Sequence, residues 1–177
     1  MKALSIKQPW ADLVVLGIKR IENRTWKSNY RGPLAIHASK TFDEEGAVWI
    51  KEEFPFLEQH IKVSRYNLGG FVGHVTMTDC IEMSGDVWFS GPFGFVFINP
   101  KGIKFKPWKG QQSFFHAPLD FCGSCGADIT GYDLCISHKC VDRSKIVTIF
   151  DNPSLFKEEE VAWAQNYAKN IILRDEL

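Results

Sequence analysis

The residues best able to do chemistry cluster in a short charged stretch, Gly17–Arg24, with the sequence GIKRIENR. Lys19, Glu22 and Arg24 place an ammonium, a carboxylate and a guanidinium close together in the chain. The two cations can hold a phosphate or a carbonyl oxygen, and the carboxylate can act as a general base or bond the exocyclic amine of a nucleobase. A solvated surface ladder made of Arg20, Glu22 and Arg24 would need no ligand and would contribute only about 0–1 kcal/mol per pair.

Residues that can stack on a base or bond its edge surround this stretch, between Ser5 and Lys40. Aromatic rings stack on bases, and side-chain amides offer both a donor and an acceptor. The alternative for the tryptophans and for the histidine is a place in the core. Ser90, in the segment SGPFG (90–94), is a weaker candidate for a hydroxyl in the site. The candidate ligand-binding residues are Gln8, Trp10, Lys19, Glu22, Arg24, Trp26, Tyr30, Arg31, His37, Ser39 and Lys40.

A second chemical cluster is rich in cysteine. Two residues separate Cys122 from Cys125, a spacing that lets one turn present both thiolates to a tetrahedral Zn²⁺. Cys135 and Cys140 complete four ligands, with His138 as the alternative fourth ligand. Because four protein ligands close the coordination sphere, we expect a structural zinc site without catalysis, and no organic cofactor. The alternative is a loop that carries inert thiols.

The elements expected around the charged stretch are a strand and a helix before it, and a strand within it. The run ALSIK (3–7) predicts a first strand, Pro9 suits the first turn of a helix, and Gly17 suits the end of that helix. The sequence KRIENR alternates as a strand does, which places Arg20, Glu22 and Arg24 on one face.

The rest of the chain predicts more strands with helices between the early ones. Thr41 and Glu44 have capping-box spacing and would open an acidic helix that ends before Pro55. The predicted class is α+β, a small mixed β-barrel with flanking helices. Further strands are expected at 33–39, 69–83, 93–100 and 113–121.

We expect three regions along the chain. Residues 1–121 would form the barrel, and residues 122–142 the cysteine-rich zinc-binding segment. Residues 143–177 would supply a return strand and a C-terminal amphipathic helix that packs on the barrel.

Composition narrows the classes of function. A chain of 177 residues that is 45% hydrophobic suits a globular domain with a sizeable core. The net charge of zero argues against a non-specific coat for duplex DNA, yet residues 1–40 hold eight Lys or Arg against Asp12 and Glu22, and such patches attract phosphates. We see no membrane-length apolar run and no signal peptide, so we expect a cytoplasmic protein whose terminal RDEL is coincidental.

The block from Ser5 to Lys40 resembles the ASCH domain, the activating-signal-cointegrator homology family. The resemblance rests on SIKQPWA, GIKRIENR and YRGPLAIHASK in that order, with weaker support from GGFVGHVTMTDCIE and FGFVFINP. It covers about residues 3–121. The resemblance implies a PUA-like β-barrel with a cleft that faces RNA, or another nucleic acid or nucleotide.

The resemblance also implies two activities: one bacterial branch hydrolyses acylated cytidines, and some members are described as ribonucleases. In the amidohydrolase branch the lysine that matches Lys19 is catalytic, and it works with a threonine where this chain has Glu22. Because of that departure, we predict binding of RNA, single-stranded nucleic acid or a modified nucleoside in a basic, aromatic cleft. The alternative is a hydrolase of N4-acylated cytidine or of RNA that uses Lys19 and Glu22.

Overall fold

The computed structural model describes residues 1–120 together with Ser154, Glu158 and Val161. The chain divides into two compact units, Met1–Ala117 and Pro118–Leu177. The cysteine-rich segment (122–142), with all its proposed zinc ligands, and the return strand lie outside the described residues. Of the predicted C-terminal helix, the structure describes only helical positions at Glu158 and Val161.

The first unit is built on a mixed six-stranded sheet with the order β2-β5-β4-β3-β1-β6. Strands β1 and β3 are parallel and the other neighbours are antiparallel. The predicted α+β class is confirmed. The strand predicted at 113–121 is shorter than expected, because Pro118 has no backbone N–H to continue a ladder. The strands are β1 (Lys2–Gln8), β2 (Ile21–Arg24), β3 (Gly32–Phe42), β4 (Gly70–Ile81), β5 (Phe93–Pro107) and β6 (Phe114–His116).

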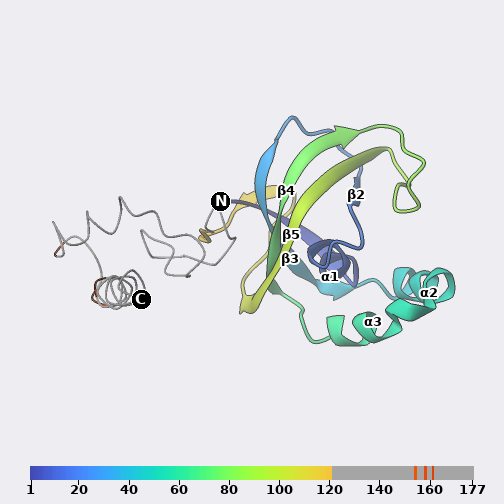
Figure 1. Ribbon diagram of the computed structural model, residues 1–177, viewed down its shortest axis with the longest axis horizontal. Coiled ribbons are helices and arrows are strands. Elements are labelled where there is room, and N and C mark those ends of the chain that lie inside the picture. Colours follow the sequence, from blue (N-terminus) through green and yellow to red (C-terminus); the bar gives the residue numbers. More distant parts are fainter. Residues whose placement is uncertain (121–153, 155–157, 159–160, 162–177) are drawn as a thin grey trace, which may run out of the picture. The chain divides into compact units, whose positions relative to one another are not determined.

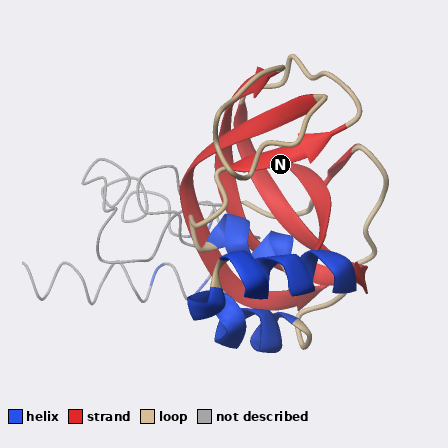
Figure 2. Cartoon of the chain, turned by 90° about the vertical axis from the view of Figure 1, so that its right-hand side faces the viewer, coloured by secondary structure: helices blue, strands red, loops and turns tan. Residues whose placement is uncertain are grey.

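Short helices connect the early strands: α1 (Trp10–Val15) precedes β2, and α2 (Glu44–Glu53), the 3₁₀ turn η1 (Pro55–Leu57) and α3 (Glu58–Ser64) join β3 to β4. Figures 1 and 2 show α2 and α3 together at one end of the curled sheet. Within the described part of the chain, no helix is long and apolar enough to cross a membrane.

The start of α2 differs from the predicted capping box. Asp43, not Thr41, is the N-cap, and its carboxylate accepts a hydrogen bond from the Gly46 backbone N–H. Thr41 instead lies inside β3, which extends further than the sequence pattern indicated.

The core has two parts that together position the site. Between the sheet and α1, one cluster gathers aliphatic and aromatic side chains such as Leu4, Ile36 and Phe95, each with no exposed surface. The other lies under the helices and includes Leu13, Ile50 and Trp88, with Trp10 and Trp49 packed against it. Burying such side chains stabilises the fold by about 1.5–3 kcal/mol each.

Side chains, not strand pairing, fill the space between the outer strands of the sheet. Strands β2 and β6 are the outer strands, and no ladder joins them among the described residues. The Trp26 ring lies 5.0 Å from Phe114 of β6 and 4.9 Å from Phe95 of β5, both edge to face. The predicted barrel is therefore a strongly curled sheet, as Figure 2 shows, and the Trp26 ring links β5 to the outer strand β6.

Candidate functional site

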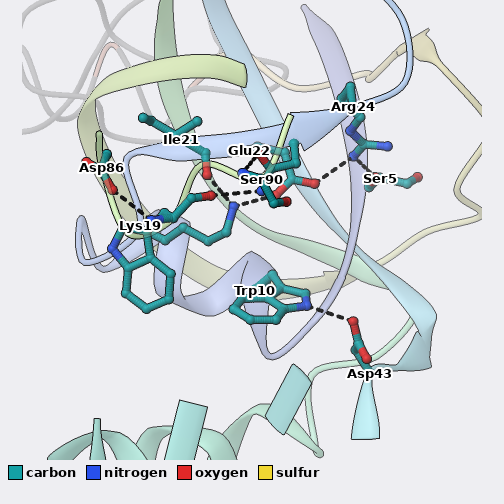
Figure 3. Close-up of polar contacts among 11 residues, drawn as sticks. Ser5, Trp10, Lys19, Ile21, Glu22, Arg24, Asp43, Asp86 and Ser90 are labelled. Carbon is teal, nitrogen blue, oxygen red and sulfur yellow. Dashed lines mark hydrogen bonds and ion pairs between the residues drawn. The ribbon is translucent and has the colours of Figure 1, made fainter. Parts of the chain in front are cut away.

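A buried group of alternating charges occupies β2 and the turn before it. The Lys19 ammonium lies 2.9 Å from Oε2 of Glu22 and also donates to the Ile21 carbonyl, and the Arg24 guanidinium lies 3.3 Å from Oε1 of the same carboxylate. Lys19 is 4% exposed and Glu22 9%. The alternative of a solvated surface ladder is therefore wrong, because Glu22 is buried and pairs with Lys19 while Arg20 is exposed. Figure 3 shows Glu22 between the two cations.

The backbone before β2 explains why Lys19 turns inward. Helix α1 ends at Val15, and two residues later comes Gly17, whose φ of 77° few residues other than glycine adopt readily. The backbone N–H groups of Ile18 and Lys19 both bond the Leu13 carbonyl, which folds the chain back under the helix. Glu22 then pairs in register with Phe95 of β5.

Three tryptophans line one cavity of about 360 Å³, the tryptophan pocket, together with Lys19 and Glu22 of the charged group. Trp10, Trp49 and Trp88 come from α1, α2 and the segment before β5, and their rings lie 5.8–6.2 Å apart. Lys19 and Glu22 form its polar side. This volume lies within the range of small-molecule sites, about 300–1,000 Å³.

Asn23 fixes the remaining wall of the tryptophan pocket. Its side-chain amide donates to the Trp88 carbonyl at 2.8 Å and accepts from the Ser90 backbone N–H at 2.9 Å. Asp86 accepts a further hydrogen bond from the Trp88 N–H at 2.8 Å. Asn23, Trp88 and Ser90 all line the pocket, so one amide side chain of β2 holds the segment that closes it.

The carboxylate of Asp43, which caps α2, also binds the indole of Trp10 at the pocket. Oδ2 accepts from the indole N–H of Trp10 at 2.9 Å, while Oδ1 accepts from Gly46 at 3.0 Å. Burial raises the pKa of Asp43, but these two hydrogen bonds and the charge of Lys7 outweigh it, so the pKa lies below its ordinary value. The N-cap of α2 is thus also an anchor for the pocket.

The charges and hydrogen-bond groups of the site favour a ligand with paired donors and acceptors. Lys19 presents an ammonium and Glu22 a carboxylate side by side, next to indole faces. The group Lys19, Glu22 and Arg24 carries one net positive charge. Among the described residues, the Nε of Arg24 is a buried donor without a hydrogen-bond partner. Such a site can bond the edge of a base and tolerate a nearby anion.

Some predicted ligand residues lie elsewhere and have structural partners. Gln8 is fully buried, and its amide nitrogen donates to Asp12 at 2.8 Å and to the Asn67 carbonyl at 3.1 Å. Its amide hydrogens are therefore engaged within the protein. Trp26 packs between strands, as described above.

His37 is buried on the side of β3 that faces the end of β5. Its Nε2 lies 3.0 Å from the Trp108 carbonyl, so this nitrogen carries the proton, and its Nδ1 lies 3.2 Å from the Ser5 hydroxyl. Burial lowers the pKa of His37, and the bond to Trp108 offsets only part of that effect. The histidine therefore has a structural place, which was the alternative considered for it.

The other predicted residues also lie outside the lining of the tryptophan pocket. Tyr30 donates to the Pro33 carbonyl, and Arg31 pairs with Asp79 at 2.7 Å. Ser39 bonds the Thr41 carbonyl, and Lys40 is exposed. Of the predicted set, the pocket brings together Trp10, Lys19 and Glu22, with Arg24 joined through its ion pair.

Sequence reasoning missed Asn23, Trp49, Val87 and Trp88, and it ranked Ser90 low. Asn23 lies within the charged stretch, so its position between Glu22 and Arg24 was a usable signal. Trp49 and Trp88 are far from that stretch in the chain and carry no motif, so only the fold brings them to the site.

Comparisons with known proteins agree with the resemblance seen in the sequence. The family described as ASCH domain matches residues 4–89. Over 130 and 124 residues, the chain is 34% identical to activating signal cointegrator 1 of Mus musculus and of Homo sapiens, and each match covers 63% of this chain. The chain spans about a fifth of the length of these curated relatives. A crystal structure of ASCH from Zymomonas mobilis matches with a TM-score of 0.41 and 12% identity, over 64% of this chain and 85% of that one.

Proposed function

This chain carries an ASCH domain, and from that premise we propose that the tryptophan pocket binds one base of single-stranded RNA or a modified nucleoside. The observation that carries the proposal is the adjacency of Lys19 and Glu22, a donor and an acceptor 2.9 Å apart beside indole rings. The polar edge of a base presents donors and acceptors side by side. Stacking on an aromatic side chain adds about 1–3 kcal/mol per base.

Pocket size supports one base and not a duplex. The cavity of about 360 Å³ lies near the lower end of the range for small-molecule sites, so it suits a single base better than a base pair. A base that enters must leave its stack, and this costs least in single strands.

The test is a titration of the full chain with the common ribonucleosides and with short single-stranded RNA. Tryptophan fluorescence is measured at each addition to detect binding. We expect quenching in the wild type and a loss of affinity of at least about tenfold in Lys19→Met, because a donor is lost from the pocket. Lys27→Ala is the matched control, since Lys27 is exposed, pairs with Glu82 and does not line the pocket. Absence of binding by the wild type to every probe would overturn the proposal.

Hydrolysis is the second candidate, favoured by the same pair of residues. The Glu22 carboxylate could take a proton from an attacking water while the Lys19 ammonium stabilises the oxyanion that forms on the substrate, and the proton would then pass to the leaving amine or hydroxyl as the scissile bond breaks. Incubation with N4-acetylcytidine and with labelled RNA separates the candidates. If the wild type hydrolyses either substrate and Glu22→Gln does not, the result supports hydrolysis. If the wild type binds a substrate without hydrolysing it, only the binding function is supported.

A further inference from the structure

A second cavity lies next to the tryptophan pocket and shares one residue with it. This cavity of about 440 Å³, the Arg20 pocket, is formed by the end of α1, the turn before β2 and residues 97–100 of β5. Lys19 lines both cavities and no other lining residue is common to them. The two cavities are therefore separate spaces on either side of Lys19.

The walls of the Arg20 pocket combine apolar and polar surface in nearly equal parts. Val14 and Phe97 are almost completely buried, at 1% and 3% exposure, whereas Leu16 and Ile98 remain 51% and 45% exposed. The exposed aliphatic side chains in this lining offer an apolar surface on which a flat ring can be desolvated.

The polar side chains in the lining are those of Lys19, Arg20 and Asn99, and of the two cations Arg20 is the exposed one. The Arg20 carbonyl accepts a hydrogen bond of 2.8 Å from the Phe97 N–H, which fixes its backbone against β5. Within the described part of the chain, the Arg20 guanidinium takes part in no ion pair, whereas Arg24, Arg31 and Arg65 each pair with a carboxylate. A guanidinium outside any ion pair, beside the exposed aliphatic side chains of Leu16 and Ile98, suits a ring that carries a phosphate.

We propose that the Arg20 pocket holds the nucleotide next to the base in the tryptophan pocket, with the connecting phosphate on Arg20. This inference rests on the proposed function and makes it more specific, because it identifies the ligand as a single strand of at least two nucleotides. Lys19, as the common wall, lies where the strand passes from one cavity to the other.

The test compares a ribonucleoside, its monophosphates and the ribodinucleotides that contain it, each titrated into the full chain by calorimetry. We expect the best dinucleotide to bind about tenfold more tightly than the nucleoside, since one more base is packed. Arg20→Ala should remove that gain and leave the nucleoside affinity unchanged. It should also reduce the slope of log K against log salt by about 0.7, the value for one phosphate contact in a single strand.

Arg31→Ala is the matched control, because Arg31 is an exposed arginine that lines neither pocket. The inference is overturned if the dinucleotide gains nothing over the nucleoside, if a monophosphate alone gains as much, or if the gain survives Arg20→Ala. An equal loss in Arg31→Ala would also overturn it, by showing a general charge effect. The nucleoside arm tests the proposed function separately, so the two failures are distinguishable.

Discussion

The ammonium of Lys19 lies 2.9 Å from the carboxylate of Glu22, three residues further along the chain, and both side chains are almost completely shielded from water. Arg24 approaches the other oxygen of that carboxylate at 3.3 Å. One anion therefore compensates two cations in a site that also opens into a cavity lined by tryptophan. Glu22 is thus the anion that both cations share, and it also lines the pocket.

Glu22→Gln should lower the free energy of unfolding by about 3 kcal/mol, because it leaves Lys19 buried without its counter-charge. Urea unfolding measures the change. The double variant Lys19→Met/Glu22→Gln should lose less than the sum of the two single variants, since it removes both members of the pair. Strict additivity would contradict the coupling that the geometry indicates.

Asn23→Ala should weaken ligand binding while the ion pair below it survives. The variant removes both hydrogen bonds that hold Trp88 and Ser90 at the pocket wall. Faster hydrogen exchange at the Ser90 amide is the direct measurement. Asn23→Asp should keep the bond from Ser90 but place an oxygen against the Trp88 carbonyl, so it should bind ligand as poorly as Asn23→Ala. Asn67→Ala, which alters an amide outside the pocket lining, should leave exchange at Ser90 unchanged.

Asp43→Ala should lower the free energy of unfolding by about 1 kcal/mol through loss of the α2 N-cap. Loss of the hydrogen bond from the Trp10 indole should add to this decrease. Asp43→Asn has one oxygen for the two donors that Asp43 serves, so its loss should fall between the wild type and Asp43→Ala. Thermal unfolding measures the loss of stability. A change in tryptophan fluorescence would show that the environment of Trp10 at the pocket has changed. An Asp43→Asn variant as stable as the wild type would contradict the dual role.

The stability of the fold should fall as the solution becomes acidic, in part through His37. The pKa of His37 is lowered in the fold, chiefly by burial, so its contribution is complete above the ordinary value of 6.5. The contribution is lost as the pH falls from there through the lower folded pKa, because the unfolded chain takes up the proton more readily. Urea midpoints between pH 8 and about pH 5 should therefore decline more steeply in the wild type than in His37→Asn.

The zinc site proposed from Cys122, Cys125, Cys135 and Cys140, with His138 as alternative, stays a prediction. Protein purified without added metal should contain about one equivalent of zinc. Cys125→Ser should lose most of it, while Cys80→Ser, which changes a cysteine of β4, should retain it. Freely reactive thiols at these positions in the wild type, without bound zinc, would contradict the prediction.

Local signals in the sequence were sufficient for much of the fold. Pro9 and Gly17 bound α1 because one suits the first turn and the other accepts a positive φ. The runs at 3–7, 33–39, 69–83 and 93–100 predicted β1, β3, β4 and β5, and the alternation of KRIENR predicted β2. The helix α3 and the true N-cap Asp43 were missed, because weak periodicity and several nearby polar residues leave the choice to packing.

The sequence by itself determined that Lys19, Glu22 and Arg24 would lie close together, because chain connectivity keeps neighbours near each other, and it identified the domain that they belong to. Only the tertiary structure decided which cation pairs with Glu22, since that depends on how Gly17 and Leu13 turn the chain inward. The same holds for Trp49 and Trp88, which the sequence separates by long intervals from Lys19. They reach the pocket because the helices and β5 must bury their apolar faces against one core, and that requirement acts between distant segments.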